Sequence, residues 1–103
     1  MQQEPQVHDN AVAHRIELTV EGHTAFTAYE LVGRQIIFTH TQVPFELQGK
    51  GVGSQLARGA LDLASERGLD VIPYCPFVAG YIRRHHEFLG LVSPANRKRL
   101  QLE

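Results

Sequence analysis

Cysteine is almost absent from this chain of 103 residues, in which Cys75 is the only one. A single cysteine cannot form an internal disulfide, and a sequence without a disulfide framework is typical of a reducing compartment. Long apolar runs are also missing. None approaches the ~18 residues of a membrane-spanning helix, and residues 1–14 lack the basic and then apolar pattern of a secretory signal. We therefore expect a soluble, cytoplasmic protein without a membrane partner.

Charge of one sign is not in excess either. Lysine and arginine together number 10, aspartate and glutamate together number 11, and the formal net charge is −1. Nucleic-acid binding depends on basic surfaces that neutralise phosphates, so we expect no nucleic-acid partner, although a small anion needs only a local site. The six histidines show no spacing typical of metal ligands, so no metal site is expected.

The residues that are present suit one globular domain with several strands. Apolar residues make up 43% of the chain and charged residues 20%, which is typical of a folded domain of this length. Alternating or short apolar segments predict strands over 15–20, 25–31, 35–43 and 69–75. Short turns join the first three, which indicates an antiparallel meander. Pro73 has no N–H, so the last strand should lose its neighbour near that residue.

Helical periodicity appears in two later segments. Apolar residues recur at helical spacing from Val52, and Gly68 is a stop signal after this first helix. Gly59 lies within it, which indicates close packing of another segment there. A second helix should begin at Pro76. Its apolar stripe consists of Val78, Tyr81, Ile82, Phe88 and Leu89.

The order of elements, β-β-β-α-β-α, predicts an α/β fold with a mixed sheet and two helices. The crossover through the first helix should place the third and fourth strands parallel. We assign the folded domain to residues 14–95. Residues 1–13 and 96–103 show little apolar periodicity and are expected to be flexible tails.

The turn between the third strand and the first helix reads Gln48-Gly49-Lys50-Gly51-Val52-Gly53-Ser54. Glycines let the backbone approach a ligand, and the free N–H groups and positive dipole end of the following helix favour an anion. Lys50 would add a positive charge. The motif predicts a phosphate or pyrophosphate site, and the alternative is a turn whose glycines serve only the fold. It is not a Walker-type loop, because Gly51 follows Lys50, and it lacks the third glycine of a dinucleotide fingerprint.

Several motifs occur together in register. They are His40-Thr41-Gln42-Val43-Pro44, Leu47-Gln48-Gly49-Lys50-Gly51-Val52-Gly53, Pro73-Tyr74-Cys75-Pro76-Phe77-Val78, and Tyr81-Ile82 followed by His85. The pattern Gln48-x-x-Gly51-x-Gly53 is similar to the acetyl-coenzyme A motif of the GNAT superfamily of N-acetyltransferases. Over residues 16–92 the chain resembles the small YJDJ-type acetyltransferase family, a minimal GNAT domain. The resemblance implies acetyl-coenzyme A as cofactor, an amine as acceptor, and a split sheet that admits the pantetheine arm between its third and fourth strands.

The same resemblance implies which residues bind the coenzyme. The cofactor-binding candidates are Thr41, Gln42, Val43, Gln48, Gly49, Lys50, Gly51, Val52, Gly53, Ser54, Cys75 and Pro76. Exposed backbone groups over residues 41–44 would hydrogen-bond the pantetheine amides. A backbone N–H near Val43 would polarise the thioester carbonyl, as an oxyanion hole does.

Cys75, Tyr81 and His85 are the catalytic candidates. Cys75 precedes a helix whose dipole favours a thiolate. Three roles are open for it: a nucleophile, a proton donor beside the coenzyme sulfur, or a small apolar residue at a strand end. The family places a tyrosine on this helix as proton donor to the coenzyme A thiolate, which implies that role for Tyr81; alternatively its ring packs on the sheet. His85 is a general base or ends the apolar stripe, and His86 should point elsewhere.

One position departs from the family pattern. The family carries an acid in the segment where this chain has Gln42, and an amide cannot act as a base near neutral pH. That role would pass to Glu46, to His40 or to water. We expect acetyl transfer by direct attack of an amine on the thioester, with a ping-pong route through Cys75 as the variant. The alternatives are a coenzyme A-binding module with little catalysis and an interaction domain. A monomer or weak dimer is expected.

Overall fold

Five strands form one mixed sheet in the computed structural model, which describes residues 6–103. They lie side by side in chain order, and neighbours are antiparallel except β4 and β5, which are parallel. The strands are β1 (His8–Asn10), β2 (Arg15–Val20), β3 (His23–Val32), β4 (Gln35–Gln42) and β5 (Asp70–Pro73). The predicted meander and the predicted parallel crossover are both confirmed.

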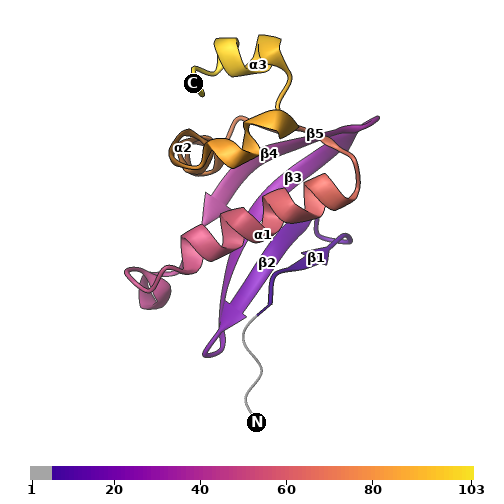
Figure 1. Ribbon diagram of the computed structural model, residues 1–103. Helices are drawn as coiled ribbons and strands as arrows, with labels where there is room; N and C mark the ends of the chain where they lie inside the picture. The colour runs from indigo at the N-terminus through magenta and orange to yellow at the C-terminus, as the bar shows by residue number, and fades with distance from the viewer. Residues whose placement is uncertain (1–5) are drawn as a thin grey trace.

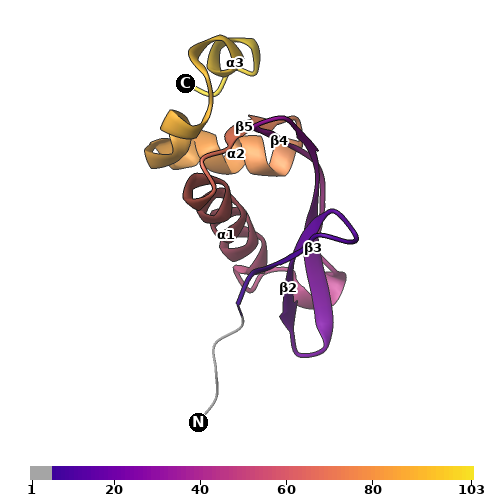
Figure 2. The ribbon, with the colours of Figure 1, turned by 90° about the vertical axis from the view of Figure 1, so that its right-hand side faces the viewer.

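Helices α1 (Val52–Glu66) and α2 (Pro76–Arg84) cover one face of the sheet, as Figure 1 and Figure 2 show. The opposite face carries no helix within the described part of the chain (Figure 2). Three shorter helices complete the fold: η1 (Phe45–Leu47), η2 (His86–Leu91) and α3 (Pro94–Arg99). The α/β class is confirmed, but the prediction of two helices was too low. Across residues 6–103, no helix combines the length and apolar character needed to cross a membrane.

The core lies between the sheet and its two covering helices. Side chains alternate along β3 and along the first residues of β4, where every second one faces the helices and is buried. The largest apolar side chains that are completely or almost completely buried are Ile16, Leu18, Phe38, Leu47, Leu56, Leu61, Val71, Val78, Ile82, Val92 and Leu102. Each contributes about 1.5–3 kcal/mol by its burial, so this layer holds α1 and α2 against the strands.

Strand β4 contains a β-bulge near its middle. The β3 partners of Phe38 and His40 are adjacent residues, so Thr39 is an extra residue in β4. In a regular strand Phe38 and Thr41 would face opposite sides of the sheet, because side chains alternate. The extra residue reverses the alternation, so both Phe38 and Thr41 face the helices.

A close contact explains the glycine in the middle of α1. A Cβ atom at Gly59 would lie 2.5 Å from Cγ2 of Val7, so only glycine lets the N-terminal segment pack against the helix. The predicted close packing at Gly59 is confirmed. The predicted end of the helix is also confirmed, since Gly68 follows it with a φ of +65°.

The predicted flexible tail over residues 1–13 is wrong where the structure describes it. Residues 8–10 pair with β2 as strand β1. The Asp9 carboxylate accepts a hydrogen bond from the Tyr29 hydroxyl (2.7 Å) and one from the Arg67 guanidinium (2.7 Å), which joins β1 to β3 and to the end of α1. Polar contacts rather than an apolar period hold this strand, so no hydrophobic pattern marked it. Residues 1–5 of the predicted tail lie outside the described residues.

Acid should weaken the attachment of β1. Burial raises the pKa of the Asp9 carboxyl, but hydrogen bonds from Arg67 and Tyr29 and the Arg67 charge outweigh it, so the pKa lies below its usual value. The stabilisation is therefore present above the pKa of the unfolded chain and is lost as pH falls through the lower folded-state pKa. We expect Asp9→Asn to reduce the free energy of unfolding by about 1 kcal/mol at pH 7, and the difference to shrink as pH falls through the lowered folded-state pKa of Asp9. Thermal unfolding between pH 2.5 and 7 measures this, and a difference that stays constant to pH 2.5 would contradict it.

Helix α2 is shorter than predicted. It ends at Arg84, and η2 continues the chain through Phe88. Ile82 and Phe88 are both buried. In a continuous α-helix two residues six positions apart would point in directions about 120° apart around the helix axis, so they could not share one face. The chain buries both by leaving the α-helix at His85, whose φ of −134° and ψ of 80° are not helical.

The predicted C-terminal tail over residues 96–103 is also wrong. Ser93 caps α3 by accepting a hydrogen bond from the Asn96 backbone N–H. Beyond α3, the Leu102 side chain is completely buried in the core. The Arg83 guanidinium donates to the Leu100 carbonyl and the adjacent carbonyl, both at 2.8 Å, and so fixes this end to α2.

Candidate functional site

A cavity of about 380 Å³ lies where the glycine-rich turn meets the end of β4. Its volume is within the range of small-molecule sites. The lining residues come from β4, the turn, the start of α1 and the start of α2, and they are Thr41, Val43, Leu47, Gln48, Gly49, Gly51, Val52, Gly53, Ser54 and Phe77. All but four of the cofactor-binding candidates line this cavity; the exceptions are Gln42, Lys50, Cys75 and Pro76.

The glycine-rich turn leaves the first N–H groups of α1 facing the cavity without a cap. Gly49 and Gly51 adopt left-handed φ values of +80° and +74°, which favour glycine. Gly51 is the N-cap residue, and no side chain caps the helix there. The first turn contains no acidic residue. The N–H groups of residues 52–54 and the positive dipole end therefore remain available to an anion.

Gly53 has a different function from the other two glycines. Its φ is ordinary, but a Cβ atom would lie 2.5 Å from Cζ of the Phe77 ring. Glycine at this position therefore lets Phe77 of α2 lie across the start of α1, where the ring forms part of the cavity wall. The sequence analysis assigned no role to Phe77, because a contact between the starts of two helices leaves no local signal. It also assigned none to Leu47, which lies in η1 and lines the same cavity.

Strands β4 and β5 separate beside this cavity. Their pairing ends at Phe38 and Pro73, and the Cys75 backbone N–H makes a last hydrogen bond to the Phe38 carbonyl at 2.8 Å. Strand β4 continues to Gln42 without β5. The prediction that β5 loses its neighbour at Pro73 is confirmed, and the sheet is split there. The end of β4 thus offers backbone groups on its open side to a ligand in the gap.

Three polar side chains meet at the inner end of the cavity. The Thr41 hydroxyl lies 3.0 Å from Cys75 Sγ and is also hydrogen-bonded to the Thr27 hydroxyl. Thr27 is completely buried, and Cys75 is 2% exposed. Cys75 is therefore not in the cavity wall but lies directly behind Thr41, which is. The sequence analysis did not identify Thr27, because its polar side chain faces inward on a strand read for its apolar pattern.

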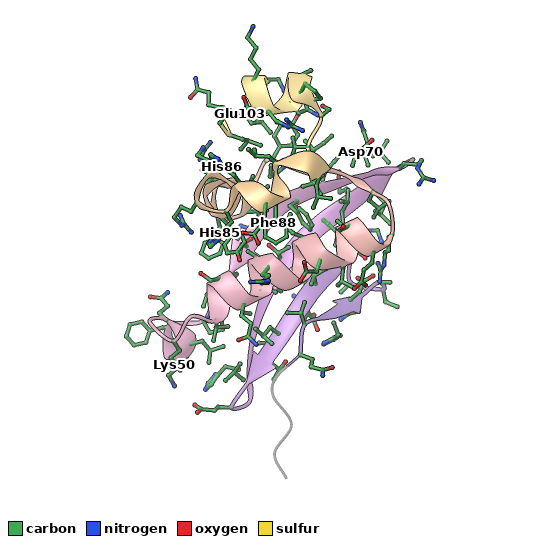
Figure 3. The ribbon with its side chains drawn as sticks, viewed as in Figure 1. Lys50, Asp70, His85, His86, Phe88 and Glu103 are labelled. Atoms are coloured by element: carbon green, nitrogen blue, oxygen red, sulfur yellow. The ribbon has the colours of Figure 1, made fainter. Side chains whose placement is uncertain are left out.

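Tyr81 and His85 lie together, away from the cavity wall. Their rings stack with centroids 4.1 Å apart, and the Tyr81 ring also contacts Phe88. Burial raises the pKa of Tyr81, which is 3% exposed. His85 Nδ1 lies 3.8 Å from a carboxylate oxygen of Glu87. Figure 3 shows His85 and His86 pointing to different sides of the chain, so the prediction for His86 is confirmed.

The remaining candidates lie at the edges of the site. Lys50 points away from α1 (Figure 3), and its ammonium lies 3.3 Å from the Glu21 carboxylate. Gln42 is exposed at the end of β4. His40 lies against Phe26 on the helix-free face of the sheet, and Glu46 lies 4.0 Å from His23. Neither possible replacement for the family's acid therefore lines the cavity. Within residues 6–103 no cluster of three His, Cys, Asp or Glu residues could hold a metal.

The fold and the site define a class: a small α/β domain with a split sheet and an uncapped, glycine-rich helix start beside the split. The family profile described as GCN5-related N-acetyl-transferase matches residues 15–91. The chain therefore belongs to the GCN5-related N-acetyltransferase family. This confirms the resemblance drawn from the glycine turn and the Cys75 segment.

Relatives of known name extend the comparison. The chain is 34% identical over 62 residues to Protein NATD1 of Gallus gallus and of Mus musculus, with 59% of this chain and 56% of each relative covered. The Homo sapiens protein of the same name is also 34% identical over 62 residues, with 55% of that relative covered. The chain thus spans little more than half the length of the curated relatives it matches.

Proposed function

We propose that this chain is an N-acetyltransferase that uses acetyl-coenzyme A and acetylates an amine by direct attack on the thioester. One observation carries the proposal: the cavity joins the uncapped start of α1 to the open end of β4. An anion suits the first and an extended amide chain suits the second. Membership of the family supports the same chemistry.

The residues of the cavity fit such a ligand. Gly49, Gly51 and the N–H groups of residues 52–54 would bind the diphosphate, since a Cβ at either glycine would meet no protein atom and the space there is open. Val43 and the open side of β4 would hydrogen-bond the pantetheine arm. Acetyl-coenzyme A supplies an electrophilic thioester when bound. The protein orients that thioester against the amine and polarises its carbonyl with fixed donors.

Binding should be visible as stabilisation. With acetyl-coenzyme A at ~100 times its dissociation constant, we expect the free energy of unfolding to rise by about 2.7 kcal/mol. Thermal unfolding with acetyl-coenzyme A, dephospho-coenzyme A and ATP measures the rise and its specificity. No shift at millimolar acetyl-coenzyme A would overturn the proposal and leave an interaction domain whose glycine turn serves only the fold.

A coenzyme A-binding module with little catalysis is the second candidate, and the composition of the cavity favours it. No aspartate, glutamate, histidine, lysine, cysteine or tyrosine lines the cavity within the described residues. Gln42 also stands where the resemblance calls for an acid. Turnover separates the two candidates: release of free coenzyme A thiol with a panel of polyamines, amino acids and peptide N-termini supports the transferase, and binding without release supports the module.

A further inference from the structure

The direction of the hydrogen bonds around Thr41 follows from burial. The Thr27 hydroxyl is completely buried, and Thr41 is its only hydrogen-bond partner within residues 6–103. A buried hydroxyl proton without an acceptor is costly. Thr27 therefore donates to Thr41 Oγ1 rather than accepting from it.

The same reasoning applies to Cys75. Its side chain is 2% exposed, caps no N–H of α2, and has Thr41 Oγ1 as its single partner in the described chain. Either atom of this contact can donate, and in the arrangement inferred here the thiol, a weak donor, donates to Thr41 Oγ1. Thr41 Oγ1 then accepts from Thr27 on β3 and from Cys75 at the start of α2. A hydroxyl oxygen accepts two hydrogen bonds, so its own proton has no partner in the described protein.

That free proton belongs to a residue of the cavity wall. Thr41 lines the cavity, whereas Thr27 and Cys75 do not. The β4 bulge turns Thr41 toward the helices, and pairing of β3 with β4 places Thr27 directly opposite. The two contacts hold the Thr41 side chain in one orientation, and when Thr41 Oγ1 accepts both hydrogen bonds its O–H is left to a ligand in the cavity. The fold therefore presents a fixed hydrogen-bond donor at the inner end of a site that lacks charged groups.

We propose that Thr41 donates this hydrogen bond to the carbonyl oxygen of the thioester, and that Thr27 and Cys75 are positioning residues that aim it. This rests on the acetyl transfer proposed above. As the amine nitrogen forms its bond to the carbonyl carbon, the carbonyl electron pair moves to oxygen, where the Thr41 O–H stabilises it. The pair then returns, the carbon–sulfur bond breaks, and its electrons leave with sulfur. The proton lost from nitrogen balances the proton gained by coenzyme A.

Paired substitutions test the donor itself. Thr41→Val keeps the shape and removes the hydroxyl, so we expect kcat to fall by about 10²-fold while the Kd of acetyl-coenzyme A changes less than about threefold. Thr41→Ser keeps the hydroxyl and should restore most of the rate. Isothermal titration calorimetry measures the Kd of acetyl-coenzyme A, and the thiol-release assay measures kcat. A Thr41→Val enzyme with a normal kcat, or a loss confined to Kd, would overturn the proposal.

The positioning residues are tested in the same way. Thr27→Val should lower kcat about tenfold, a smaller loss than the roughly 10²-fold loss expected on removing the donor, and Thr27→Ser should restore it. Cys75→Ser keeps a donor and should retain most of the rate, whereas Cys75→Ala should not. If serine and alanine at Cys75 are equally inactive, the residue is a nucleophile and the positioning role is wrong. If Thr27→Val fails to fold, the Thr41 and Cys75 pairs still decide the outcome.

A ligand-free measurement separates failure of this inference from failure of the proposed function. If the hydroxyls of Thr27 and Thr41 are bonded as described, their losses of stability are coupled. The Thr27→Val, Thr41→Val double variant should then melt no lower than the less stable single variant. Additive losses would overturn the hydrogen-bond arrangement whether or not acetyl-coenzyme A binds, and absent binding with coupled losses would overturn only the function.

Discussion

Replacing Leu102 with alanine should reduce the free energy of unfolding by about 3 kcal/mol. Leu102 lies one residue from the C-terminus, yet its side chain is completely buried with the core residues of the sheet and helices. Truncating it removes the transfer free energy of three buried carbons and leaves a cavity, because Arg83 holds the backbone carbonyls of residues 100 and 101 and so resists collapse of this segment into the space. For a domain of this size the melting temperature should fall by about 10–20 °C.

Lys98→Ala is the matched control for that prediction. Lys98 lies on the exposed side of α3, so its truncation should change stability by less than about 0.5 kcal/mol. Chemical denaturation of both variants gives the comparison. A Leu102→Ala protein as stable as the Lys98→Ala protein would mean that the last residues do not pack on the core.

Replacing Gly51 with valine should weaken binding of acetyl-coenzyme A at least tenfold, which is about 1.4 kcal/mol. Gly51 has a φ of +74° at the start of α1, and a Cβ there would meet no protein atom within 4 Å. Because Gly51 lines the cavity, we expect the valine side chain to occupy space that the ligand needs. The left-handed backbone should cost about 1–2 kcal/mol of stability in addition.

Gly33→Val separates backbone strain from the loss of ligand space. Gly33 also has a positive φ, +58°, and an unobstructed Cβ direction, but it lies in the turn between β3 and β4 and does not line the cavity. It should lose similar stability and bind acetyl-coenzyme A with wild-type affinity in a calorimetric titration. Equal losses of affinity in both variants would show that strain, rather than occupied ligand space, accounts for the effect.

Local patterns were enough to predict most of the sheet and α1. Alternation over residues 15–20 marked β2 with the bounds that the structure has, because each side chain on a half-buried strand faces either core or solvent. Gly68 marked the end of α1 for an equally local reason. The lining of the cavity by residues 48–49 and 51–54 also follows from one contiguous turn. Such features depend on neighbours in the chain and are therefore visible in it.

The two tails were misread because their order depends on distant partners. Strand β1 exists through Asp9, which is hydrogen-bonded to Tyr29 and Arg67, far along the chain. The C-terminal residues are ordered because Leu102 enters a core built from other elements. Neither contact could be predicted from the sequence, because a short polar strand and a single buried leucine produce no repeating pattern of apolar residues.

The type of fold, the glycine-rich turn and its place before α1 could be read from the chain alone, because each is specified by residues close in sequence. The arrangement of side chains at the inner end of the site could not be predicted in this way. Thr27, Thr41 and Cys75 meet only because β3 pairs with β4 in one register, the bulge at Thr39 turns Thr41 inward, and β5 delivers Cys75 behind it. A shift of one residue in that register would reverse every side chain on the strand, and the packing of the whole domain is what selects it.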